Sequence, residues 1–83
     1  MNVTLEQLDR FYGKNPYVVV DYISGGRWAW QLRVQGQVID AFSWNCRELA
    51  RMDGHAQAKK HGCAIHFSPM FHFLKDKSYE VAS

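Results

Sequence analysis

Cysteine and long hydrophobic runs are scarce in this sequence, and each shortage excludes a class of protein. The two cysteines, Cys46 and Cys63, can form at most one bridge, which excludes a small domain held together by disulfides. No segment approaches the roughly 18 consecutive apolar residues of a membrane-spanning helix. The opening segment, MNVTLEQLDR, carries acidic side chains where a targeting peptide would be basic. We therefore expect a soluble, cytoplasmic protein that makes no contact with a membrane.

Charge of one sign is also limited. Ten lysines and arginines stand against eight aspartates and glutamates, so the net charge is only +2. This charge is too small for the strong positive field on which nonspecific nucleic-acid binding usually depends. In contrast, 47% of the residues are hydrophobic and 14% are aromatic, far above the composition of disordered chains. The 83 residues are predicted to form a single compact domain over residues 1–83.

A short helix is predicted near the start of the chain. Thr4 and Gln7 have the spacing of a capping box, so the helix should begin at Leu5. Gly13 can adopt the left-handed conformation that ends a helix, and Pro16 prevents its continuation. The predicted helix has only about two turns and depends on the core for stability.

A longer helix is predicted over residues 46–61. Asn45 and Glu48 have the spacing of a second capping box, and Gly62 follows as a stop signal. Gly54 lies inside this helix, where glycine costs about 1 kcal/mol relative to alanine. Close approach of the helix to a sheet would explain its presence.

Three segments rich in β-branched and aromatic residues predict an antiparallel meander. They span residues 17–23, 27–34 and 37–42, and the pairs Gly25-Gly26 and Gln35-Gly36 between them are typical of two-residue turns. After the second helix, CAIHF predicts a strand and MFHFL predicts another at a sheet edge. The expected fold is α+β, with an antiparallel β-sheet made of a three-stranded meander plus one or two C-terminal strands. Two helices pack on one face of it, in the order α-β-β-β-α-β(-β).

The turn lengths predict which side chains share a face of the sheet. With two residues in each turn, Trp28 and Trp30 lie on a face that carries one charge, Asp21, while the opposite face carries three. Because an unpaired buried charge is costly, the helices should cover the tryptophan face. Trp28 and Trp30 are then core residues, and an indole N–H bond to the Asp21 carboxylate would satisfy that charge.

The opposite face combines apolar and arginine side chains, which is unusual for a solvated sheet face. Arginine, tyrosine and tryptophan dominate the energetic centres of protein interfaces, so this face is the predicted partner-binding surface. Three other interpretations are that the C-terminal segment covers the face, that Trp44 has already turned into the cap of the second helix, or that two copies pair through the face as a homodimer. A bulge at Gln35-Gly36 would exchange the faces of the third strand. The candidate partner-binding residues are Arg27, Gln31, Arg33, Tyr22, Phe42 and Trp44.

No arrangement of side chains predicts catalysis or metal binding. Cys46 begins the second helix, but no histidine lies at helical spacing from it, and the chain has no nucleophile elbow or glycine-rich oxyanion loop. His61, Cys63, His66 and His72 match no zinc-ligand spacing. We expect a protein that is not an enzyme, with no catalytic residues, no metal and no cofactor.

The order helix, three antiparallel strands, helix over residues 4–61 resembles the double-stranded RNA-binding domain. That family places lysines at the start of its second helix to contact phosphates, and the matching stretch here is Cys46-Arg47-Glu48-Leu49-Ala50-Arg51. The resemblance implies nucleic-acid binding, which is the alternative function. The residues expected to bind nucleic acid are Arg47, Arg51, Lys59 and Lys60.

The chain is also similar in build to the small phage- and prophage-encoded inhibitors of bacterial defence, including anti-CRISPR proteins. The similarity is one of size, aromatic content and absence of motifs, and it assigns no residues. It implies a non-enzymatic interaction protein that binds and inhibits a host protein or ribonucleoprotein complex such as a CRISPR effector. The open sheet face and the positively charged end of the second helix would make the contact.

Overall fold

The fold combines two helices with a four-stranded sheet. The computed structural model describes residues 4–68 and Phe71. The predicted α+β class and the order α-β-β-β-α-β are confirmed. The second C-terminal strand, predicted from MFHFL, lies outside the described residues apart from Phe71. The elements are α1 (Leu5–Tyr12), β1 (Tyr17–Ser24), β2 (Arg27–Val34), β3 (Gln37–Trp44), α2 (Arg47–His61) and β4 (Ala64–Phe67).

The capping box predicted for α1 is present, and the one predicted for α2 is not. Thr4 Oγ1 accepts a hydrogen bond from the Gln7 amide at 3.1 Å, and Gln7 Oε1 accepts one from the Thr4 amide at 2.9 Å. α2 has Cys46 as its N-cap residue, without a side-chain hydrogen bond, and Glu48 forms an ion pair within the helix instead. Neither described helix is long and apolar enough to cross a membrane.

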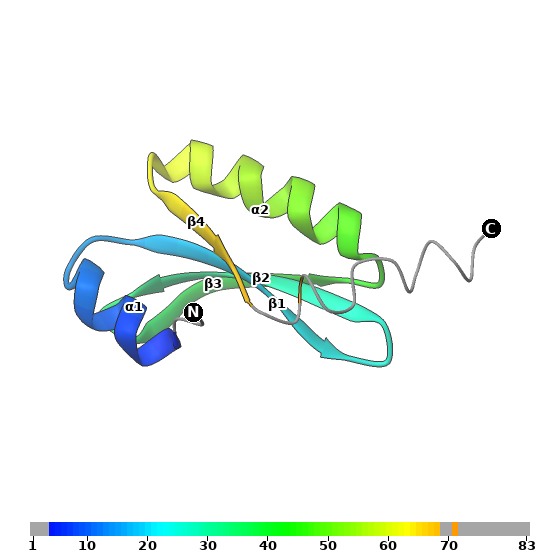
Figure 1. Cartoon of the computed structure of the whole chain (residues 1–83). Coiled ribbons are helices and arrows are strands. Elements are labelled where there is room, and N and C mark those ends of the chain that lie inside the picture. The colour runs from blue at the N-terminus through cyan, green and yellow to red at the C-terminus, as the bar shows by residue number, and fades with distance from the viewer. Residues whose placement is uncertain (1–3, 69–70, 72–83) are drawn as a thin grey trace.

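The sequence predicted an antiparallel sheet, but the sheet is mixed. The strand order is β3-β2-β1-β4, with β1, β2 and β3 forming the predicted meander. β4 pairs with β1 in parallel. Because β3 and β4 run in the same direction at opposite edges, the chain needs a crossover between them, and α2 provides it above the sheet (Figure 1).

Two one-residue bulges shift the predicted register. In β1, Tyr22 pairs with Trp28 and Ser24 pairs with Arg27, so Ile23 between them has no partner. In β3, Ile39 is the extra residue, because Val38 pairs with Arg33 while Asp40 pairs with Leu32. An extra residue moves every side chain beyond it to the other face of the sheet. The predicted sets of residues on the two faces are therefore wrong for β1 and for β3 beyond Ile39.

The helices consequently lie on opposite faces of the sheet, and the prediction that both pack on one face is wrong (Figure 1). α1 covers one end of its face, where Leu8 packs against Tyr17 and Val19. α2 covers the other face, where Trp28 and Trp30 are buried as predicted. The main buried cluster contains Val18, Val20, Trp28, Trp30, Leu32, Ala50, Ala58 and Phe71.

Candidate interaction surface

The six side chains predicted to bind a partner do not share one surface. The bulges in β1 and β3 place them in two groups on opposite faces of the sheet, although Arg27, Phe42 and Trp44 line one hollow of about 360 Å³ at the end of β3. The α1 side carries Arg27, Gln31 and Arg33, whereas the α2 side carries Tyr22, Phe42 and Trp44. The open face predicted from the turn lengths is therefore absent as a single surface in the described part of the chain.

Arg33 is held inside the protein by Asp9. Its guanidinium pairs with the Asp9 carboxylate at 2.9 Å and also donates to Gln31 Oε1 at 3.2 Å. Tyr17 donates a further hydrogen bond to Asp9 at 2.5 Å. The hydrogen bonds from Arg33 and Tyr17 lower the pKa of Asp9, so the carboxylate is charged when it fastens α1 to the sheet. Arg27 is exposed and donates to Ser43 Oγ at 2.6 Å.

On the α2 side, the indoles of Trp30 and Trp44 both donate to Asp53 Oδ2, at 2.5 and 2.9 Å. The indole bond predicted for Asp21 is thus made by Asp53, and Asp21 accepts from the backbone N–H of Tyr22 at 2.7 Å. Burial by itself raises the pKa of Asp53, but the hydrogen bonds it accepts outweigh burial and lower that pKa below its usual value. Asp53 is therefore a charged residue that joins α2 to two strands.

Tyr22 has a structural position at the first turn. Its ring packs against Trp28 with centroids 5.1 Å apart, and its hydroxyl accepts a hydrogen bond from Gly26 N–H at 3.1 Å. Of the three predicted residues on the α2 side, Phe42 is the most exposed, while Tyr22 and Trp44 are half-buried. Phe42 is therefore the member of the predicted set that is most available to a partner.

Phe42 belongs to an exposed apolar strand at the edge of the sheet. β3 pairs with β2 on one side, and no described strand pairs with its other side. Three large apolar side chains on β3 are about half exposed: Val38 (47%), Ile39 (59%) and Phe42 (53%). Val38 lies on the α1 side of the sheet and Phe42 on the α2 side, with Ile39 at the bulge between them. We call the outer backbone of β3, together with these three side chains that flank it, the edge surface. Long, apolar, unpaired edges are sites where another strand can add.

A shallow hollow of about 290 Å³ lies beside the edge surface, between β3 and α2. We call it the acidic–aromatic hollow. Its walls combine aromatic rings with two carboxylates, and no basic side chain lines it. The residues that matter for its chemistry are Trp30, Asp40, Phe42, Trp44, Asp53 and Gln57.

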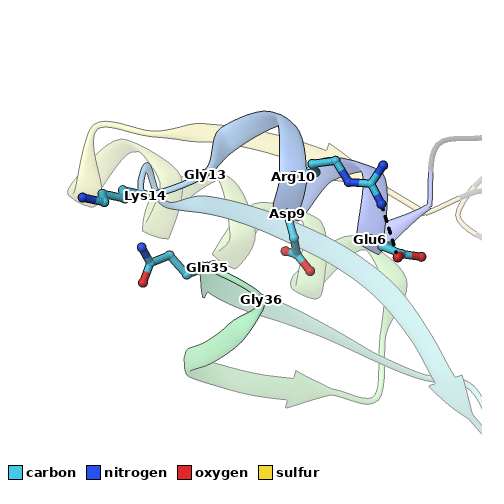
Figure 2. A pocket seen from close by; sticks show the side chains of 7 residues that line it. All are labelled: Glu6, Asp9, Arg10, Gly13, Lys14, Gln35 and Gly36. Carbon is cyan, nitrogen blue, oxygen red and sulfur yellow. Dashed lines mark hydrogen bonds and ion pairs between the residues drawn. The ribbon is translucent and has the colours of Figure 1, made fainter.

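A larger hollow of about 460 Å³ lies between α1 and the turn that joins β2 to β3. Figure 2 shows its walls, with Glu6 and Arg10 bonded to each other and Lys14 and Gln35 at the opposite side. Asp9 at its base is already paired with Arg33. Because most of its charges are matched within the protein, this hollow has less unsatisfied binding capacity than the one beside β3.

The four residues proposed for nucleic-acid binding fall into two groups. Arg47 stacks on Phe71, with its guanidinium carbon 3.5 Å from the ring centroid, and donates to the Phe71 carbonyl at 3.1 Å. Arg51 is paired with Glu48. Lys59 and Lys60 are exposed in the last turn of α2. Of the four, only Lys59 and Lys60 have side chains without an ion pair, ring contact or hydrogen bond within the described residues.

The histidine and cysteine side chains do not converge. Among the described residues, no group of three His, Cys, Asp or Glu side chains is placed to hold a metal ion. His66 Nε2 lies 2.6 Å from the Tyr12 hydroxyl and joins β4 to α1. Both cysteines are free thiols, and burial raises the pKa of Cys63. His72 lies outside the described residues.

Sequence reasoning missed Asp9 and Asp53, which make the contacts that place both helices. Aspartate is unfavourable inside a helix, so its presence in α1 and in the middle of α2 is a signal that each has a tertiary partner. The identity of the partner, however, depends on which strand lies beneath the helix. The sequence therefore indicates which aspartates have a structural role but does not predict the side chains that they contact.

Comparisons with known proteins identify no relative. No protein-family model matches the chain, and no curated protein or solved structure is significantly similar to it.

Proposed function

We propose that this protein is a non-enzymatic interaction module that binds an extended segment of a partner protein along the edge surface of β3. One observation carries the proposal: β3 has eight residues, its first six are exposed, and three of these are large and apolar. Burying such side chains against a partner is favourable by about 25 cal/mol per Å² of apolar area. Backbone hydrogen bonds to an added strand would supply the alignment.

The edge carries little that opposes strand addition. Its one charged side chain is Asp40, which accepts a hydrogen bond from the next amide, Ala41 N–H, at 2.9 Å. Lysine, proline, a bulge or a covering element are the usual ways of blocking an edge strand. β3 contains neither lysine nor proline, but it has the bulge at Ile39. A partner strand would have to compete with Asp40 for one amide and follow the edge past this bulge.

The proposed partner class is the one expected from the build of the chain, a host protein or ribonucleoprotein complex. Inhibition of phage or prophage type is a finer proposal that depends on size, aromatic content and absence of motifs. The contact surface proposed here is the edge surface and not the open face predicted from the sequence. Phe42 belongs to both.

Selection of short random peptides displayed on phage against the immobilised protein tests the function. We expect the enriched peptides to alternate apolar and polar residues, as strands do. Ile39→Lys should weaken their binding at least tenfold, because it puts a charge on the edge. Methylation of alternate amides in the peptide should have a similar effect, because it removes the donors of the added strand.

Ile23→Lys is the matched control. Ile23 is the extra residue of the other bulge and has a similar exposure, 52% against 59% for Ile39, but it lies away from β3. Peptide binding should survive this change. Absence of any enriched peptide, or equal loss in the two variants, contradicts the proposed function.

Nucleic-acid binding is a second candidate because the three lysines within the described residues are exposed and gather at one end of the fold. β1 begins beside the start of β4 and the end of β2, so the loop that contains Lys14 lies at the same end as Lys59 and Lys60 (Figure 1). Lysine side chains of this kind can contact a phosphate backbone.

A further inference from the structure

The carboxylates of the described residues divide into two groups by the partners that they have. Glu6, Asp9 and Glu48 each pair with an arginine. Asp21, Asp40 and Asp53 accept hydrogen bonds only from neutral donors, and two of these, Asp40 and Asp53, line the acidic–aromatic hollow. The hollow therefore contains negative charge that no cation of the described chain balances by an ion pair.

Asp53 retains capacity to accept another hydrogen bond. Both indoles donate to its Oδ2, while its Oδ1 receives only a long contact of 3.4 Å from Gln57. A carboxylate oxygen can accept more than one donor, so Oδ1 has room for an incoming N–H group. The hydrogen bonds that Asp53 accepts lower its pKa despite burial, so they favour the ionised carboxylate.

Aromatic rings form another part of the wall. Phe42 and Trp44 meet edge to face with centroids 5.1 Å apart, and Phe42 is half exposed. The face of such a ring attracts a cation, and the attraction is stronger where water is partly excluded. Two carboxylates beside two aromatic rings therefore favour a positively charged group over a neutral one of similar shape.

The lysines of α2 leave this space free. Lys59 and Lys60 follow Gln57 by two and three residues, but both are exposed and neither lines the hollow. Residues that lie opposite each other on paired strands point to the same face of the sheet. The residue of an added strand that lies opposite Phe42 would therefore project beside Phe42, at the border of the hollow.

We propose that the acidic–aromatic hollow receives a lysine or arginine side chain of the partner segment bound on β3. This inference rests on the proposed function, because the strand on β3 brings the cation to the hollow. The carboxylates would bind the cationic head, and the rings of Phe42 and Trp44 would contact its aliphatic stem.

The indole N–H signals provide a direct test. We would titrate isotope-labelled protein with N-acetylarginine amide and N-acetyllysine amide, and with the neutral N-acetylcitrulline amide, and follow the three tryptophan indoles by NMR. The indoles of Trp30 and Trp44, which bond to Asp53, should shift with the cations and much less with citrulline. Trp28, buried elsewhere under α2 against Tyr22 and Phe71, should stay unchanged.

Asp40→Asn and Asp21→Asn form a matched pair of variants. Each aspartate bonds the amide of the next residue, and asparagine can keep that bond, so both proteins should fold. Asp40→Asn should weaken the cation-dependent shifts several-fold, whereas Asp21→Asn should leave them unchanged. Equal shifts with citrulline, no shifts, or the same response in both variants would overturn the inference.

Failure of the inference can be told apart from failure of the proposed function. Peptides that bind through Ile39 without an enriched lysine or arginine keep the edge surface and overturn the cation site. Cation-dependent indole shifts without any edge-binding peptide overturn both the strand-addition function and the proposed role of the hollow in it. Enrichment of peptides with a basic residue at one fixed position, lost in Asp40→Asn, supports both.

Discussion

At the scale of single residues, Gly54 controls how closely α2 approaches the sheet. A Cβ atom at this position would lie 2.8 Å from Val20 Cγ2 and 3.3 Å from Ile65 Cδ1. Val20 is fully buried in a strand paired on both sides, so it has little space to move. The glycine that is unfavourable for an isolated helix is thus explained by the close packing that the sequence predicted.

Gly54→Ala should destabilise the protein although alanine is the better helix former. Overpacking of a filled core costs about 1–3 kcal/mol, against a gain of about 1 kcal/mol in helix propensity. We expect a lower free energy of unfolding in urea denaturation. Ala56→Gly, at an exposed site on the same helix, measures the propensity effect alone. A Gly54→Ala protein more stable than the parent would show that α2 can move away from the strands.

At the scale of elements, α1 is attached to the sheet through polar contacts as much as through apolar ones. Asp9 receives hydrogen bonds from Arg33 and Tyr17, and Tyr12 contacts His66. Burial and the bond to Asp9 raise the pKa of Tyr17 to about 12. The hydroxyl of Tyr17 therefore remains a donor at all ordinary pH values. A helix of only eight residues needs such contacts, because helices of this length are unstable alone.

Asp9→Asn should lower the free energy of unfolding by roughly 1–3 kcal/mol at neutral pH, because it weakens a partly buried, charge-assisted network. The folded protein holds the pKa of Asp9 below its ordinary value of 3.8. The stabilisation is therefore fully present above that value and is lost as the pH falls below it. Urea unfolding at several pH values should show parent and variant converging in acid.

Glu6→Gln is the control for this experiment. Glu6 and Arg10 form an exposed pair on the same helix, so its loss should change stability little at any pH. A constant difference between the parent and Asp9→Asn down to acidic pH would show that the charge of Asp9 does not stabilise α1.

At the scale of the whole molecule, basic and acidic–aromatic surfaces lie on different parts of the fold. Lys14, Lys59 and Lys60 lie at the end where β1 starts, in loop and helix-end segments 13–16 and 59–63 that contain no carboxylate. Both helices also end there, and lysines near helix C-termini offset the negative end of the helix dipole. The positive field of this end is therefore modest, which favours protein binding at β3 over nucleic-acid binding.

Nucleic-acid binding at that end predicts a gel shift of duplex RNA or DNA at low salt that is lost near physiological salt. Lys59→Glu combined with Lys60→Glu should abolish the shift, because both side chains are exposed. Arg47→Gln should have little effect on it, since Arg47 is engaged with Phe71. A duplex that stays unshifted at low salt contradicts this second candidate function.

Local signals in the sequence were sufficient for the elements and for part of the core. The capping box at Thr4, the stop at Gly62 and the runs of β-branched residues predicted helices and strands to within a few residues. Trp28 and Trp30 were correctly placed in the core. These features depend on neighbouring residues, whose backbone preferences and hydrogen bonds are visible in a short window of sequence.

Only the tertiary structure decided which face each side chain occupies and which carboxylate meets which donor. The bulges at Ile23 and Ile39 add one residue each, and no turn residue marks them in the sequence. Since side chains alternate along a strand, one extra residue transfers a whole set to the other face. The sequence by itself thus determined the elements and the buried tryptophans. The edge surface, the hollow beside it and the Asp53 contacts arose from packing between segments that are distant in the chain.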